Sequence, residues 1–126
     1  MFLRTLFVIR KQYFYPTKIL KTMPNSTPAG EVITLPEAII YVNDFRKKFP
    51  KEIKASIFDC SLIQKLLDQT NCSQLKIYYG YDDQGSHLAP VLVGIDDEGH
   101  DMTAGIILER SGMCPDQCDF ASPLMK

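Results

Sequence analysis

Cys114 and Cys118 are the residues whose type and spacing best suit chemistry, because they form a C-x3-C pair that includes Pro115. Two thiolates at this spacing can supply half of a tetrahedral zinc site, although structural zinc sites usually contain two such pairs, spaced C-x2-C or C-x4-C. The pair can also form a disulfide or act in thiol redox chemistry, but it lacks the usual two-residue spacing. Three alternatives stay open: a metal site, a redox or disulfide pair, and unreactive thiols, which we favour.

His87 is the best candidate for a third metal ligand, with Asp82 or Asp83 as a further one. If the strands of this region form a meander, the chain that follows the last strand returns to the turn that holds these residues. Cys72 belongs to the opposite end of the strands, about 25 to 30 Å away at the usual rise per residue. A site that joins all four cysteines is therefore disfavoured. If a metal binds, its predicted ligands are Cys114, Cys118 and His87.

Two acidic turns flank the most apolar strand of the sequence. The run Asp96–Glu98 begins like a calcium loop, but Gly99 is the fourth residue rather than the sixth, and Ile107 stands at the twelfth position, where an EF-hand has Glu. A polar turn with Gly99 in the left-handed region accounts for the same residues. The other turn, at residues 82–86, belongs to the far end of the strand, so we expect no paired-carboxylate site.

No catalytic signature is present. The sequence lacks G-x-x-x-x-G-K-[ST], G-x-G-x-x-G, H-E-x-x-H and G-x-S-x-G. A nucleophilic pair of Cys114 and His87 has no third group to orient it. Strand alternation places Tyr79 and Tyr81 at the edge of the core and leaves Tyr78 as the tyrosine to test for ligand contact. We therefore assign no catalytic residue, and no cofactor apart from the zinc considered above.

The elements that position these residues begin with three strands between residues 75 and 108. In Leu75–Asp82, apolar side chains alternate with others, which is typical of a strand with one buried and one wetter face. Leu88–Ile95 is apolar on both faces and is predicted to be the central strand. A third strand is centred on Ile106–Leu108.

Two helices are expected before this sheet. Thr34–Glu37 has the form of a capping box, and apolar residues follow at three- and four-residue steps until Pro50. Ala55–Phe58 is a short strand candidate, and a second helix starts near Ser61 and ends before Asn71. Each helix must pack its apolar face on the sheet. The expected fold is α+β: a mainly antiparallel meander of three or four strands with two helices packed on one face.

Composition and charge exclude several classes of protein. The 126-residue chain is 45% hydrophobic and carries a net charge of −1. Residues 1–54 contain ten Lys or Arg against four Asp or Glu, whereas residues 59–126 contain four against eleven. An acidic sheet repels phosphate, so no nucleic-acid partner is expected. No apolar run is long enough to cross a membrane. Four cysteines are too few for a disulfide scaffold, which favours reduced thiols in the cytoplasm.

The first 22 residues are basic and do not match a secretory signal, because Arg4 and the pair Arg10-Lys11 interrupt the apolar run. Pro16 disrupts the period of an amphipathic membrane helix. A third interpretation is that the native protein starts at Met23, before a flexible linker. The predicted division is a leader and linker at residues 1–30 and one α+β domain with an extended C-terminal tail at residues 31–126.

Five segments together carry a resemblance to a known family. They are Ile77–Asp82 (IYYGYD), Val91–Asp96 (VLVGID), Gly99–Asp101 (GHD), Gly105–Glu109 (GIILE) and Cys114–Cys118 (CPDQC). With them the chain resembles a family of small uncharacterised bacterial proteins that end in C-P-x-x-C and a short S-P-L-like tail. The resemblance covers residues 35–126 and omits the basic leader, which favours a start at Met23. The resemblance implies the limits of the domain but does not point to any activity.

The function expected from the sequence is that of a small, cytoplasmic, non-enzymatic module that acts through contacts with a protein partner. The basis is a chain that can form a core and a polar surface but has no assembled catalytic set. The alternative is a zinc-binding or thiol-redox protein that uses Cys114 and Cys118.

Overall fold

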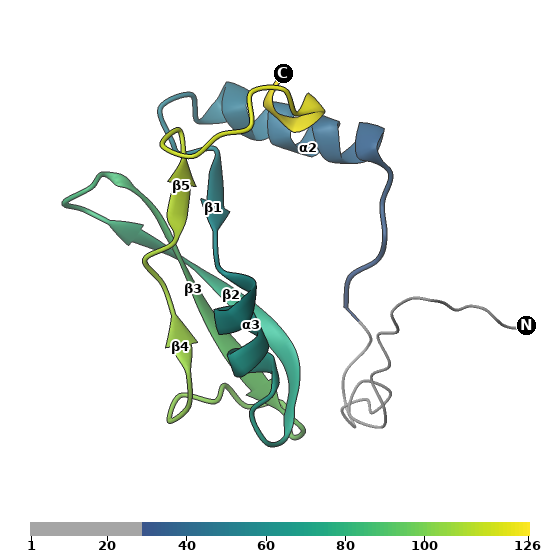
Figure 1. The fold of residues 1–126 in the computed structure, drawn as a ribbon, viewed down its shortest axis with the longest axis vertical. Coiled ribbons are helices and arrows are strands. Elements are labelled where there is room, and N and C mark those ends of the chain that lie inside the picture. The colour runs from purple at the N-terminus through teal and green to yellow at the C-terminus, as the bar shows by residue number, and fades with distance from the viewer. Residues whose placement is uncertain (1–28) are drawn as a thin grey trace, which may run out of the picture.

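A computed structural model describes residues 29–126 of the chain, so the leader and the proposed start at Met23 lie outside the described residues. The described part contains two α-helices and two antiparallel sheets, of three and two strands (Figure 1). This arrangement confirms the α+β class expected from the sequence. No helix within residues 29–126 combines the length and apolar character needed to cross a membrane.

Helix α2 spans Leu35–Lys48 and starts as the capping box predicts. The amide of Glu37 donates to the hydroxyl of Thr34 at 3.2 Å, which satisfies one of the amides that a helix start leaves without a partner. The helix ends at its C-cap Phe49, directly before Pro50. A proline cannot continue the helical hydrogen bonding, so the end also follows from the sequence.

The smaller sheet pairs β1 (Ala55–Ile57) with β5 (Gly112–Cys114) in antiparallel register, with Ala55 opposite Cys114. β1 lies where a short strand was expected. β5 was not predicted as a strand, because three residues are too few to show an alternating pattern. Directly after β1 comes α3 (Cys60–Leu67), whose N-cap is Asp59.

The larger sheet has the order β2-β3-β4, with β2 at Cys72–Asp82, β3 at His87–Asp96 and β4 at Ile107–Leu108. All neighbours are antiparallel, so the sheet is the expected meander with β3 in its centre. Asp82 pairs with His87 at one end of the hairpin, and Cys72 pairs with Asp96 at the other. The two acidic turns therefore lie at opposite ends of β3, as predicted.

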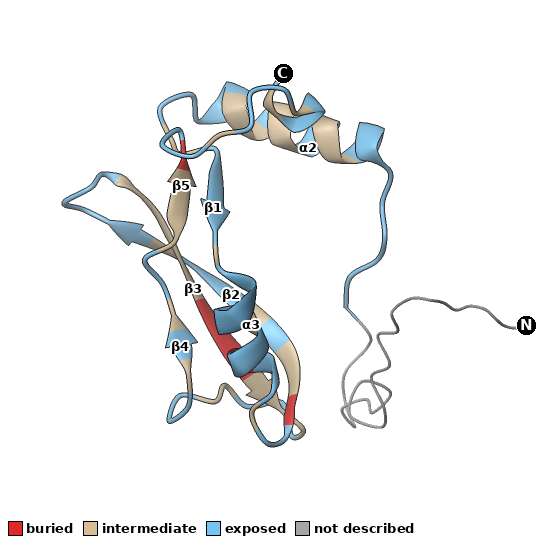
Figure 2. Cartoon of the chain, in the orientation of Figure 1, coloured by how far each residue is buried: buried red, intermediate tan, exposed pale blue. Residues whose placement is uncertain are grey.

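The core forms where α3 packs on β2 and β3, and it is small. Leu66 is fully buried and contacts the buried side chains of Cys72 and Leu92. The partly buried side chains packed around them are Phe58, Ile63, Met102, Ile106 and Leu108. Figure 2 shows the largest buried stretch on β3, behind α3. An eight-residue helix is about 12 Å long, whereas an eleven-residue strand is about 35 Å long, so α3 covers only part of β2.

The first helix packs elsewhere. α3 lies on the larger sheet as expected, but α2 lies against the short 3-10 helix η2 (Pro123–Met125) near the C-terminus (Figure 1). Arg46 joins the two, because its guanidinium donates to the carbonyl of Leu124 and to a backbone oxygen of Lys126, each at 2.7 Å. Arg46 is half-buried at this contact, whereas its neighbour Lys47 is exposed.

Candidate functional site

Cys114 and Cys118 are joined by a disulfide, and their Cα atoms are 4.9 Å apart. The expectation of unreactive free thiols is therefore wrong for this pair, and the disulfide alternative describes it. The turn between the two cysteines is closed by the amide of Gln117, which donates to the carbonyl of Met113 at 2.7 Å. The other cysteines are free: Cys60 is exposed and Cys72 is buried.

The disulfide also lies at the junction between β5 and the C-terminal segment. Cys114 is only 2% exposed, and its Sγ lies 3.7 Å from Sδ of Met125 in η2. Its carbonyl accepts a hydrogen bond of 2.8 Å from the amide of Lys54, next to β1. The pair therefore directs the chain from the smaller sheet toward α2.

His87 is not brought to the cysteines. It begins β3 at the tip of the hairpin, where its Nδ1 is 2.6 Å from the carbonyl oxygen of Leu88 and its Nε2 is 3.7 Å from Oδ2 of Asp82. Asp83 is exposed in the same turn. Within residues 29–126, no three side chains of His, Cys, Asp or Glu are grouped so that they can hold a metal ion.

The path of the chain after β4 explains this separation. The meander argument assumed that the chain continues along β3 toward the hairpin tip. Arg110 instead takes a positive φ of 62°, and the next residues pair with β1 as β5. A zinc site at Cys114 and Cys118 also needs two thiolates, which the disulfide does not offer, so the zinc hypothesis applies to the reduced chain.

Tyr78, which the sequence singled out for ligand contact, belongs instead to a polar cluster with Lys76 and Asp101. The ammonium of Lys76 donates to Oδ1 of Asp101 at 2.9 Å and to the hydroxyl of Tyr78 at 3.2 Å. The Tyr78 hydroxyl in turn donates to Oδ2 of Asp101. Sequence reasoning missed this cluster. Asp101 follows the turn after β3 and is placed beside the sheet by an isolated β-bridge to Ile95, which no local pattern indicates.

The charges of this cluster hold each other in the ionised form. Hydrogen bonds from Tyr78 and then Lys76 lower the pKa of Asp101. Hydrogen bonds to Asp101 and then Tyr78 raise the pKa of Lys76. An acid or base of catalysis needs a pKa near the working pH, and both shifts move away from neutrality. The cluster therefore suits a structural role on the polar face of the sheet.

The acidic turns are likewise explained by local hydrogen bonding. Oδ1 of Asp96 accepts from the amides of Glu98 and His100, both at 2.9 Å, and the bond from His100 contributes most to a lowered pKa of Asp96. Gly99 has a φ of +91°, as the predicted left-handed turn requires. In the other turn, Oδ1 of Asp82 accepts hydrogen bonds from the amides of Gln84 and Gly85. Both carboxylates stabilise turns.

An apolar groove of about 260 Å³ lies on the surface of the described residues. It lies where the end of α2 and the start of β1 face the part of β2 and β3 that α3 does not cover. Its main apolar lining residues are Phe45, Ile53, Ile77, Tyr79, Leu88 and Pro90. The sequence contains no local signal for this groove, because its walls come from segments that are distant along the chain.

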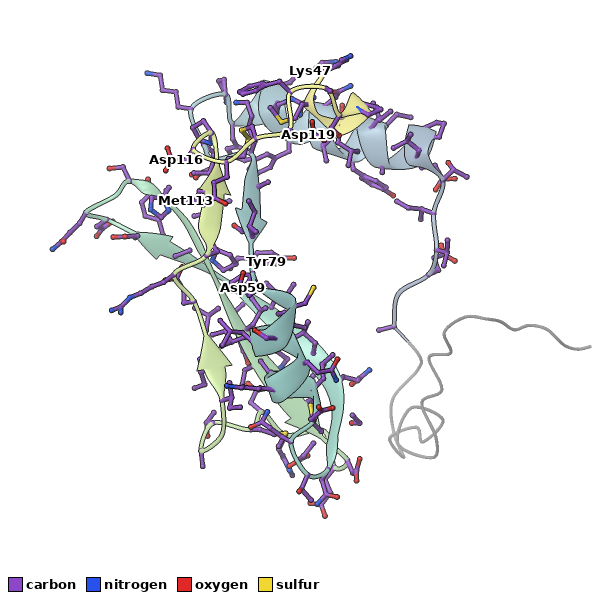
Figure 3. All side chains as sticks on the ribbon, in the orientation of Figure 1. Lys47, Asp59, Tyr79, Met113, Asp116 and Asp119 are labelled. Atoms are coloured by element: carbon purple, nitrogen blue, oxygen red, sulfur yellow. A yellow bond between two sulfur atoms is a disulfide. The ribbon has the colours of Figure 1, made fainter. Side chains whose placement is uncertain are left out.

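Tyr79 and Tyr81 do not join the core, and that prediction is wrong. Tyr79 is 86% exposed and Tyr81 is 57% exposed, although both lie on the face of β2 that also bears Ile77. α3 is too short to reach them, and α2 packs on η2 instead. Figure 3 marks Tyr79 near the end of β1 in this view. We define Ile77, Tyr79 and Tyr81 as the β2 apolar row.

Glu52 fixes one wall of the groove to its floor. Its Oε1 accepts a hydrogen bond of 2.7 Å from the amide of Leu88 and one of 3.0 Å from the amide of Ile53. The segment before β1 is thereby held against the start of β3. The groove is thus a defined feature of the fold and not a gap between loose segments.

Comparison of the chain with known protein families, curated protein sequences and solved structures gave no match. The resemblance to small bacterial proteins with a C-P-x-x-C ending stays a prediction.

Proposed function

We propose that the chain is a non-enzymatic module that binds a protein partner through the β2 apolar row and the adjoining groove. The observation that carries this proposal is the exposure of Tyr79, which is 86% exposed although it lies on the apolar face of a strand. A large aromatic side chain beside an apolar groove is the type of residue that anchors protein interfaces. We place this module in the cytoplasm.

The arrangement of the row fits contact with an extended protein segment. Side chains on one face of a strand repeat every second residue, which matches the repeat of another extended chain laid beside it. On the opposite face of β2, Lys76 and Asp101 pair with each other. The row itself therefore offers aromatic and aliphatic contact, and Lys54 is the charged residue among those that line the adjoining groove.

A photo-crosslinking residue placed at Tyr79 tests the proposal. We expect discrete covalent adducts with protein when cells that express this full chain are irradiated. The matched control carries the same crosslinker at Tyr41, which is 69% exposed on α2 and away from the groove. Adducts from position 79 should disappear when Ile77→Ser is added, because that change removes an apolar contact in the same row.

The result against the proposal is equally clear. If position 79 gives no adduct, or gives the same adducts as position 41, or keeps its adducts in the Ile77→Ser chain, the row is not a binding surface. Circular dichroism of each variant checks that the fold is retained.

A second candidate function rests on the disulfide of Cys114 and Cys118. As a thiol-redox pair, it would accept two electrons and two protons from a dithiol reductant and become two thiols, with release of the oxidised reductant. Cys118 is partly exposed whereas Cys114 is buried, so an incoming thiolate reaches Cys118 first. In the cytoplasm, the glutathione and thioredoxin systems keep most such pairs reduced.

Alkylation of thiols in intact cells tests this second function. A redox pair in the cytoplasm should carry two alkylated thiols at positions 114 and 118 in untreated cells and lose them after a mild oxidant. Zinc content of the reduced protein is measured in parallel, with Cys114→Ser as the control, because the zinc hypothesis requires the same thiolates. A disulfide that persists under all conditions would leave it a structural crosslink.

A further inference from the structure

β2 is an open edge of the larger sheet. In the order β2-β3-β4, it hydrogen-bonds to β3 on one side, and in the described part of the chain no strand pairs with its other side. It is eleven residues long and contains no proline. Its one irregularity, between Cys72 and Gln74, lies outside the stretch Leu75–Asp82. Natural proteins usually protect an edge of this kind with charge, proline or a covering element.

We propose that the partner of this surface is a second copy of the chain, and that the two β2 strands pair antiparallel about a two-fold axis at Tyr79. This inference rests on the proposed function and names its partner. The product is a continuous six-stranded sheet in which the β2 apolar rows of both copies share one face.

The symmetry restricts the pairings that are available. A two-fold axis perpendicular to the sheet keeps the same face of both copies on the same side, so residues opposite each other must have numbers with an even sum. The axis therefore lies midway between one residue and the same residue of the other copy. The central candidates are Tyr78, Tyr79 and Gly80.

Charge selects the register centred on Tyr79. In that register Lys76 of one copy lies opposite Asp82 of the other, and symmetry forms this pair twice. The Lys76 ammonium has three donors, and Asp101 and Tyr78 accept two of them, so one hydrogen remains for Asp82. Opposite charges on facing strand positions stabilise the pair of strands.

Side-chain size selects the same register. Ile77 lies opposite Tyr81, and Tyr78 lies opposite Gly80, so the aromatic ring can cover the position that has no side chain. Tyr79 meets its own copy at the axis and is the most exposed side chain of the strand. An axis at Tyr78 would instead place Lys76 opposite Gly80 and leave its charge without a partner across the strands. An axis at Gly80 would place Ile77 opposite Asp83.

The interface is short, which sets the conditions of the test. Seven paired residues form roughly six to eight backbone hydrogen bonds. Their contact area falls below the roughly 800 Å² per partner of a standard stable interface. The dimer should therefore be weak, and the full chain must be examined up to a few hundred micromolar.

Sedimentation velocity of the full chain from about 5 to 300 µM is the first measurement. We expect the weight-average sedimentation coefficient to rise with concentration toward that of a dimer. Tyr79→Lys places two positive charges together at the axis and should abolish this rise, whereas Tyr41→Lys makes the same change on exposed α2 and should not. Because Tyr79 is 86% exposed, its substitution should leave the monomer folded.

Cysteine crosslinking tests the register. In a Cys60→Ser background, which removes the exposed free thiol, Tyr79→Cys should oxidise to a covalent dimer at least tenfold faster than Tyr78→Cys. A chain that stays monomeric at 300 µM, or a faster reaction at position 78, would overturn the inference. If photo-crosslinking at Tyr79 still captures other proteins in the Ile77-dependent manner, the proposed function survives this failure. If position 79 captures nothing, both fail.

Discussion

Asp101 shows how one residue beyond a turn can determine the polar face of the sheet. Its carboxylate receives hydrogen bonds from Lys76 and from Tyr78 across the strands. The sequence predicted that Tyr78 points away from the core, and this is what leaves its hydroxyl available. The sequence could not predict that Asp101 accepts from this hydroxyl, because the contact depends on how the chain folds back after Gly99.

We predict that Asp101→Asn lowers the midpoint of thermal unfolding at pH 7, with a loss that depends on pH. The pKa of Asp101 is lowered in the folded chain, chiefly by the Tyr78 hydroxyl. Its contribution is therefore present above the unfolded pKa of about 3.9 and is lost as the pH falls through the lower folded value. Thermal unfolding of both chains from pH 7 to pH 2 should give midpoints that converge below about pH 4.

Asp44→Asn is the matched control, since Asp44 is exposed on α2. It removes the same charge and should leave the midpoint nearly unchanged across this range. A constant difference between wild type and Asp101→Asn down to pH 2 would mean that the carboxylate charge does not stabilise the cluster.

Tyr79 marks the limit of arguments from alternation. The spacing of Ile77, Tyr79 and Tyr81 correctly places them on one face of the strand, but a face is buried only where another element covers it. That depends on the length and position of a helix, which no pattern within the strand contains. The exposure of Tyr79 is the residue-level fact on which the proposed interface depends.

The elements themselves follow from local chemistry to different degrees. The start of α2 at Thr34, its end before Pro50 and the hairpin of β2 and β3 were all predicted, because caps, proline and alternation act within a few residues. β5 was missed, since Gly112–Cys114 acquires its strand conformation by pairing with β1. The split into two sheets likewise depends on contacts between distant segments.

Arg46 provides the contact that places α2 on η2, and we predict that its loss frees the C-terminal segment. Arg46→Ala removes the two donated hydrogen bonds to Leu124 and Lys126. Amide exchange at Met125, measured by NMR, should become about tenfold faster, which corresponds to about 1.4 kcal/mol. Arg46→Lys should recover only part of the protection, because a lysine lacks the planar fork that reaches both oxygens.

Lys47→Ala is the control for this prediction, because Lys47 is exposed on the next position of the same helix. Equal exchange in Arg46→Ala and Lys47→Ala would show that the C-terminal segment is held by the disulfide and its contact with Met125 alone.

At the scale of the whole molecule, residues 29–126 form two packed regions. One contains α3 and the larger sheet around Leu66, and the other contains α2, the smaller sheet and η2. The sequence predicted the α+β class and most elements of the first region. It predicted α2 and β1 of the second region but not how they come together, because the pairing of β1 with β5 joins residues whose proximity depends on the rest of the fold.

Glu52 links these two regions, and we predict that removing its carboxylate weakens the whole fold. The amides of Leu88 and Ile53 would both lose their acceptor, and a partly buried amide without a partner costs about 1 to 2 kcal/mol. Urea unfolding of Glu52→Ala should show a loss of this size, with Glu52→Gln intermediate because its amide oxygen still accepts. Lys51→Ala, an exposed neighbour, should change stability by less than about 0.5 kcal/mol. Hydrogen exchange at the Leu88 amide separates the causes. Faster exchange in Glu52→Ala alone ties the loss of stability to this hydrogen bond. Unchanged exchange would show that the two regions are held together by the apolar residues that line the groove.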